Sequence, residues 1–105
     1  MIHTVGPYYD TAHPERSAKL LRSAYAQSLE LAAANDITDL AFPAISCGVF
    51  AYPVQEAAAI ALAAIKDHSR TTPHSKIRTV TFVLFDARTT RTWLNAALDV
   101  ATTVV

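Results

Sequence analysis

The residues best suited to chemistry form one loop, Ser46–Tyr52, which lies between an apolar segment and an alanine-rich one. Ala41–Ile45 has the composition of a buried strand, and Pro53 suits the first turn of a helix. The first N–H groups of a helix lack intrahelical partners, and the helix dipole favours negative charge there. Gly48 lets a ligand approach the backbone closely, and Ser46 adds a hydroxyl. This pattern predicts a phosphate-binding loop.

Aromatic residues in the same loop add a surface for a sugar or a base, because Phe50 and Tyr52 carry flat rings. The candidate ligand-binding residues are Ser46, Cys47, Gly48, Val49, Phe50, Ala51 and Tyr52. An ordinary strand-to-helix turn also needs small residues, so the spacing alone leaves that alternative open.

Cys47 has two interpretations. A helix N-terminus lowers the pKa of a thiol, which would make Cys47 a nucleophile. No histidine is close in sequence to activate it, so a small residue at a turn is the favoured interpretation. The four histidines are scattered without ligand spacing, and we expect no metal site. No two carboxylates stand out as an acid/base pair, so no catalytic residue is predicted from the sequence.

Three strands and three helices are expected to position this loop. Strands are expected at Met1–Val5, Leu40–Ile45 and Ile77–Phe85. Helices are expected at Pro14–Ala34, from Pro53 to about His68, and after a cap at Thr89 or Thr90. The apolar stripe of the first helix consists of Leu21, Tyr25, Leu29 and Ala32. Strands that alternate with helices predict an α/β fold with a parallel sheet covered on both faces.

Composition indicates one globular domain. The chain has 105 residues, of which 51% are hydrophobic and 17% charged, and its formal net charge is +0. This balance gives no electrostatic reason to expect binding to nucleic acid or to an anionic membrane. No apolar run approaches the roughly 20 residues that span a bilayer. A single cysteine cannot form an internal disulfide, and we expect a cytoplasmic protein.

The segment Ala41–Pro53 closely resembles the phosphate-binding loop of macro domains, which recognise ADP-ribose. It follows the family pattern A-F-P-x-I-S-T-G-I/V-F/Y-G-Y/F-P except at Cys47, where Thr is usual, and at Ala51, where Gly is usual. Ile2–Pro7 and Thr81–Asp86 resemble two further family motifs, in family order. The resemblance implies a three-layer α/β/α macro-like fold, here a partial βαβαβα with a small, mainly parallel sheet.

The family's leading portion has no counterpart in the sequence, including its N-A-A-N motif and the Gly-rich loop after it. We therefore expect residues 1–105 to be the C-terminal portion of a macro domain. An absent strand would lie between the first and second strands. Met1 occupies a slot where the family has an apolar residue inside a strand, so we expect that an upstream in-frame segment was lost by start-site misassignment or by truncation. Translation of the DNA upstream of the Met1 codon would test this.

The resemblance implies that the partner is ADP-ribose or a derivative such as O-acetyl-ADP-ribose or an ADP-ribosylated protein. The loop would hold the diphosphate, and Phe50 would pack against the distal ribose. Phe85 and Asp86 would contact the adenosine side, although a core residue and a helix cap are the favoured interpretations of these two. No cofactor or metal is implied. We expect weak binding and no hydrolysis from this chain alone, and the alternative is a truncated, non-catalytic fragment that acts as an interaction module.

Overall fold

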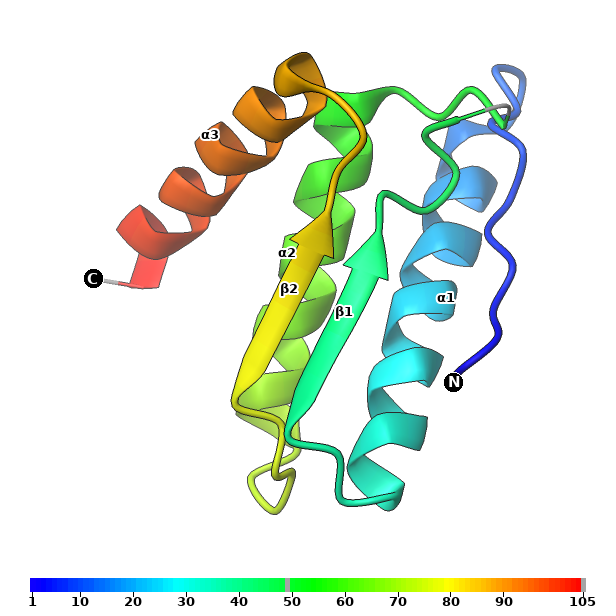
Figure 1. Cartoon of the computed structure of the whole chain (residues 1–105). Coiled ribbons are helices and arrows are strands. Elements are labelled where there is room, and N and C mark those ends of the chain that lie inside the picture. Colours follow the sequence, from blue (N-terminus) through cyan, green and yellow to red (C-terminus); the bar gives the residue numbers. More distant parts are fainter. Residues whose placement is uncertain (49, 105) are drawn as a thin grey trace.

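The computed structural model describes residues 1–48 and 50–104. Its elements follow one another as α1 (Pro14–Ala34), β1 (Asp39–Pro43), α2 (Val54–Thr71), β2 (Thr79–Val83) and α3 (Ala87–Val104). The α/β class is therefore confirmed, and the first helix has the predicted bounds. Figure 1 shows β1 and β2 side by side in front of α2, with α1 and α3 on either side.

The two strands form a small parallel sheet, as predicted. Their register pairs Asp39 with Thr79 at one end and Pro43 with Val83 at the other. Because α2 carries the chain back between the two strands, they run in the same direction and their carboxyl ends lie at one edge of the sheet. The loop after β1 and the exit of β2 are thus brought to that edge.

The core lies between the sheet and the three helices. Tyr25, Leu21 and Leu29 of the predicted α1 stripe are fully buried, and the Tyr25 ring meets the Phe42 ring edge-on with centroids 5.0 Å apart. The buried face of α2 consists of small residues, which allow its neighbours to approach closely, namely Ala57, Ala58, Ala61 and Ala64.

The prediction of a strand at Met1–Val5 is wrong, because none of these residues has strand structure. Met1 and Val5 are exposed, and Thr4–Pro7 lie against the α1 face around Ala24 and Gln27. A strand requires a neighbour to complete its hydrogen bonds, and in the described part of the chain β1 pairs only with β2. The described sheet therefore has two strands, where three were expected.

The expectation that both faces of the sheet are covered is also wrong for the described residues. Side chains alternate along each strand, so that Phe42 and Phe82 face the helices while Thr79, Thr81 and Val83 are exposed. In Figure 1, α2 lies behind the strands, and no helix of the described residues lies in front of them. No helix in the described part of the chain is long and apolar enough to cross a bilayer.

Candidate functional site

The base of the Ser46–Tyr52 loop is fixed by a side chain from α1. The hydroxyl of Tyr25 donates a hydrogen bond to the Pro43 carbonyl at 3.4 Å and accepts one from the Ile45 N–H at 3.2 Å. Burial is the main cause that raises the pKa of Tyr25, so its hydroxyl keeps the proton that it donates. The sequence indicated Tyr25 only as a core residue, because a hydroxyl that reaches a loop distant in sequence leaves no periodic signal.

The loop closes on itself through backbone hydrogen bonds. The N–H of Cys47 donates to the Ala44 carbonyl at 3.2 Å, and the N–H of Tyr52 donates to the Ser46 carbonyl at 2.9 Å. Among the described residues of the loop, Ser46 and Ala51 adopt positive φ, at 66° and 59°. The loop is thus held in one compact shape that ends at the first turn of α2.

Gly48 and Ser46 face different surroundings. Gly48 is exposed, and a Cβ added there would meet no described atom within 4 Å apart from those of its two chain neighbours. The Ser46 hydroxyl is buried and has no hydrogen-bond partner among the described residues, and a Cβ added at Gly6 would collide with it. The backbone at Gly48 is therefore open to a ligand, whereas Gly6 covers the Ser46 hydroxyl.

Two tyrosines from the segment before α1 frame the loop. The N–H of Tyr9 donates to the Phe50 carbonyl at 2.9 Å, and the Tyr8 ring lies against the Phe50 ring with centroids 4.0 Å apart. Tyr9 also meets Tyr52 edge-on at 4.9 Å. No expectation for this contact came from the sequence, although the adjacent tyrosines Tyr8 and Tyr9 were the signal that could have revealed it. The predicted residue Val49 lies outside the described residues.

Cys47 is half-buried, and burial raises the pKa of its thiol to about 11. A thiol with a raised pKa stays protonated near neutral pH and is a poor nucleophile. This geometry favours the interpretation of Cys47 as a small residue at a turn.

Phe85 and Asp86 lie beside the first turn of α2. With Pro53, Val54 and Gln55 they line a hollow of about 460 Å³, so the structure brings the second group of predicted residues close to the loop's end. Phe85 is 66% exposed and is not a core residue. None of the described residues of Ser46–Tyr52 lines this hollow, which meets the end of the loop only at Pro53, the residue after Tyr52.

Asp86 also begins α3. Its carboxylate accepts the N–H of Thr89 at 2.7 Å, and this bond is the main cause that lowers the pKa of Asp86. The prediction that Thr89 or Thr90 caps the last helix is therefore wrong, because α3 starts at Ala87 and Asp86 caps it. The helix-cap interpretation of Asp86 is confirmed, and its exposed side chain still borders the hollow.

The histidines make ordinary contacts. His13 pairs with Asp10 at 3.1 Å, and His68 hydrogen-bonds Ser75 at 3.0 Å. Among the side chains that the structure describes, no three His, Cys, Asp or Glu gather where they could hold a metal ion. His3 is exposed in the segment that lies along α1.

At the first turn of α2, Pro53 provides no side-chain cap. The helix therefore presents its first N–H groups and its positive dipole end to the hollow and to the loop. Glu56 is an acidic residue in this first turn. The arrangement can accept an anionic group at the loop and a flat or hydroxyl-rich group beside Phe85 and Asp86.

Comparisons with known proteins identify this architecture. A sequence model described as "Macro domain" matches residues 1–61. A macro domain-containing protein of Mesorhizobium japonicum is 44% identical over 98 residues, which cover 91% of this chain and 53% of that protein. An O-acetyl-ADP-ribose deacetylase of Klebsiella pneumoniae is 44% identical over 89 residues, which cover 85% of this chain and 49% of that protein.

Solved structures show the same similarity. A variant of the Oceanobacillus iheyensis macrodomain with ADPR has a TM-score of 0.85 and 33% identity, and the match covers 95% of this chain and 52% of that one. The chain thus spans about half the length of the relatives that it matches. Because the family model covers more than half of its residues, the chain belongs to the macro domain family.

Proposed function

We propose that this chain recognises ADP-ribose or a derivative such as O-acetyl-ADP-ribose through the Ser46–Tyr52 loop. One observation carries the proposal: the loop ends at a helix start without a side-chain cap, which shares a hollow with Phe85 and Asp86. A nucleoside diphosphate linked to a second sugar has the matching order of groups, with anionic phosphates between two ring-bearing ends.

The diphosphate would lie over Gly48 and the first turn of α2. Helix N-termini bind phosphate through unpaired N–H groups and the dipole. Gly48 leaves its side of the loop open, because no described atom beyond its two chain neighbours lies within 4 Å of a Cβ built there. Arg88 also borders the hollow and adds positive charge near the phosphates.

The two sugar-bearing ends would lie on either side of the phosphates. The adenosine would rest against the exposed ring of Phe85, with the Asp86 carboxylate as an acceptor for hydroxyl or amino groups. The distal ribose would pack against Phe50, whose ring is already supported by Tyr8. Backbone and carboxylate groups would thus orient both ends of the ligand.

We propose further that residues 1–105 correspond to the C-terminal portion of a macro domain, so that binding by this chain alone is weak. Relatives of about twice the length include proteins named O-acetyl-ADP-ribose deacetylase, and a solved macrodomain carries ADPR. The extra length of such relatives can supply further contacts to the ligand. We expect this chain to bind ADP-ribose with a dissociation constant above about 1 µM.

Amide chemical shifts recorded during a titration with ADP-ribose test the proposal, because they detect weak binding and locate it. The largest shifts are expected at Gly48, at Val54 and Gln55, and at Phe85 and Asp86. Calorimetric titration measures the affinity in parallel. Shifts spread evenly over the chain, or confined to another face, would show that the loop is not the phosphate site.

Gly48→Val is the decisive variant. Its side chain has room in the free protein, so the fold should remain intact, but it would occupy the position of the diphosphate and abolish the shifts. Ala34→Val, at the exposed end of α1, adds the same side chain to this structure away from the loop and should bind like the parent. Equal binding by Gly48→Val and the parent would contradict the proposal.

The second candidate function is that of a non-catalytic interaction module. The observation that favours it is the exposed face of the sheet, where Thr81 and Val83 have no covering layer among the described residues. The titration separates the two candidates, because an interaction module without a ligand site would show no shifts at the loop.

A further inference from the structure

Two aromatic rings from distant parts of the sequence meet beside the Ser46–Tyr52 loop. Tyr8 precedes α1 and Phe50 belongs to the loop, and their ring centroids lie 4.0 Å apart with the planes inclined by 32°. In Figure 1 the segment before α1 and the loop after β1 come together at the same end of the molecule. Tyr8 and Phe50, called here the aromatic pair, do not line the hollow that contains Phe85 and Asp86. The pair is therefore a surface separate from that hollow.

Tyr8 is the exposed member of the aromatic pair. It is 69% exposed, whereas Phe50 is half-buried. The Tyr8 ring thus rests on Phe50 and still presents most of its area to water. Tyrosine has only two side-chain torsions, so an exposed tyrosine supplies a large contact area at a low cost in conformational entropy.

The backbone on both sides of Tyr8 is held against the loop. On one side Gly6 lies so close to Ser46 that a Cβ added at Gly6 would collide with the serine hydroxyl. On the other side the N–H of Tyr9 donates to the Phe50 carbonyl at 2.9 Å. Tyr8 therefore has a defined place beside Phe50, although its segment forms neither helix nor strand.

The segment is also anchored to the start of α1. The N–H of Asp10 donates to the hydroxyl of Ser17 at 3.0 Å, and Ser17 is only 2% exposed. The carbonyl of Asp10 accepts the N–H of His13, also at 3.0 Å. These contacts order the segment before any ligand arrives, so a ligand that meets Tyr8 need not pay for ordering it.

The chemistry of the Tyr8 side chain suits a sugar. Its ring is an apolar surface, and its hydroxyl can both donate and accept a hydrogen bond. A ribose offers the complement, because it has C–H groups on its faces and hydroxyl groups at its edge. A ring that was needed only to cover Phe50 would not require so much of its own area in water.

We propose that Tyr8 is a specificity-determining residue, which contacts the sugar that ADP-ribose carries beyond its diphosphate. This inference rests on the proposed function, in which the adenosine lies at Phe85 and the phosphates lie over Gly48. The second sugar then reaches the aromatic pair and meets the exposed Tyr8 ring as well as Phe50. Tyr8 accordingly contributes to the affinity for ADP-ribose and not to the affinity for ADP, which ends at its second phosphate.

Amide titrations of the full chain with ADP-ribose and with ADP test this assignment. Tyr8→Ala should weaken the binding of ADP-ribose by about threefold to tenfold and that of ADP by less than about twofold. Each variant is compared with the parent for the same ligand, so the difference in charge between the two ligands cancels. Tyr8→Phe keeps the ring and should bind ADP-ribose more tightly than Tyr8→Ala.

Two further truncations to alanine are the matched controls. Phe85→Ala removes an exposed ring at the adenosine end, and it should weaken both ligands by a similar factor because both carry adenosine. Leu31→Ala truncates a leucine of α1 that is 50% exposed and distant in sequence from the loop, and both ligands should bind it like the parent.

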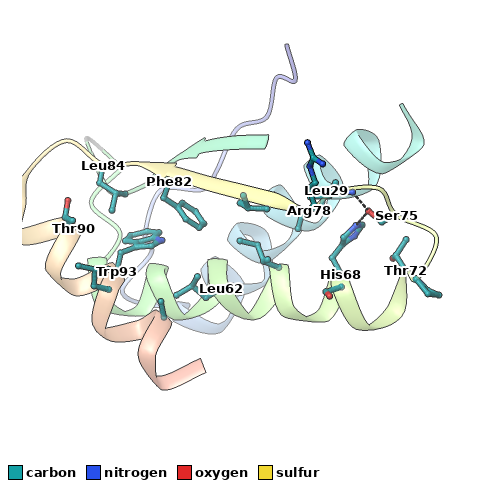
Figure 2. Close-up of a pocket in the computed structure, with 17 residues that line it drawn as sticks. Leu29, Leu62, His68, Thr72, Ser75, Arg78, Phe82, Leu84, Thr90 and Trp93 are labelled. Atoms are coloured by element: carbon teal, nitrogen blue, oxygen red, sulfur yellow. Dashed lines mark hydrogen bonds between the residues drawn. The ribbon is translucent and has the colours of Figure 1, made fainter. Parts of the chain in front are cut away.

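A separate groove provides a control within each spectrum. Leu62 and Ser75 line a groove between α2, β2 and α3, which Figure 2 shows in close-up. Their amide signals should not shift with either ligand. Since Tyr8 is largely exposed, Tyr8→Ala should also keep the parent's spectrum away from the loop and its melting temperature.

The outcomes separate this inference from the proposed function. If the parent shows loop shifts with both ligands, equal losses of ADP and ADP-ribose binding in Tyr8→Ala would overturn the inference alone, and so would unchanged ADP-ribose binding. Tyr8→Phe that binds ADP-ribose as weakly as Tyr8→Ala would overturn the contact between the ring and the sugar. The absence of loop shifts with either ligand in the parent would overturn the proposed function, and this inference with it.

Discussion

Ala51 shows how one residue of the loop departs from the usual macro domain pattern. Its φ of 59° lies in the left-handed region, where a residue with a Cβ costs roughly 1–2 kcal/mol. Glycine removes that cost. However, it loses more conformational entropy than alanine when the chain folds, which costs about 0.5–1 kcal/mol. The positive φ thus gives a physical reason why glycine would suit this position.

Ala51→Gly is therefore expected to raise the free energy of unfolding by up to about 1.5 kcal/mol, and to strengthen ADP-ribose binding or leave it unchanged. Urea denaturation and the amide titration measure the two effects. Ala59→Gly is the matched control, because Ala59 is an exposed α2 residue and glycine there should lower the free energy of unfolding by about 1 kcal/mol. A loss of stability in Ala51→Gly as large as in Ala59→Gly would contradict the strain argument.

Cys47 makes a separate prediction at the residue scale. With its pKa raised to about 11, roughly one thiol in ten thousand is ionised at pH 7. Alkylation by iodoacetamide should be slow at neutral pH, and its rate should still rise beyond pH 9. The unfolded chain in denaturant is the control, and its rate should level off near pH 9. A folded-state rate that is already at its plateau at pH 7 would restore the nucleophile interpretation.

At the scale of elements, local signals predicted most of what the structure shows. Pro14 and the stripe through Tyr25 and Leu29 defined α1, because helix starts and apolar periodicity depend on residues close in sequence. The strand expected at Met1–Val5 failed because a strand depends on a neighbour, which composition does not reveal. The predicted start of α3 was wrong because Asp86, Thr89 and Thr90 are all residues that can cap a helix, and the local sequence does not decide among them.

Asp86 links an element to the site, and its two roles can be separated. Asp86→Ala removes the acceptor for the Thr89 N–H and should lower the melting temperature, while Asp86→Asn keeps a capping oxygen and should stay closer to the parent. The folded-state pKa of Asp86 is lowered, so its stabilisation is present above the unfolded value of about 3.9 and is lost as pH falls through the lower folded value. The melting-temperature gap between parent and Asp86→Ala should close over that acidic range. A gap that is unchanged down to pH 2 would contradict the charged cap.

For the whole molecule, the sequence predicted which loop is the candidate site but not what supports it. The motif Ser46–Tyr52 is contiguous, so its resemblance is visible in the sequence. Tyr8 and Tyr25 reach the loop from segments far away in the chain, and only the folded structure brings them there. The exposed sheet face and the free edge of β2 are likewise properties of the assembled fold.

Binding and turnover should separate in this chain. Asp86 is the one carboxylate among the described residues that line the hollow beside the start of α2, and it already caps α3. An acid/base pair would need a second carboxylate there. Cys47 is a protonated thiol and cannot take that role at neutral pH. We therefore expect no release of acetate from O-acetyl-ADP-ribose above the spontaneous rate, even at ligand concentrations where amide shifts show binding. The Klebsiella pneumoniae deacetylase, which is about twice as long as the matched segment, is the positive control under the same conditions. Acetate release that is abolished by Gly48→Val would contradict this expectation, because it would place the chemistry in the Ser46–Tyr52 loop and its immediate neighbours.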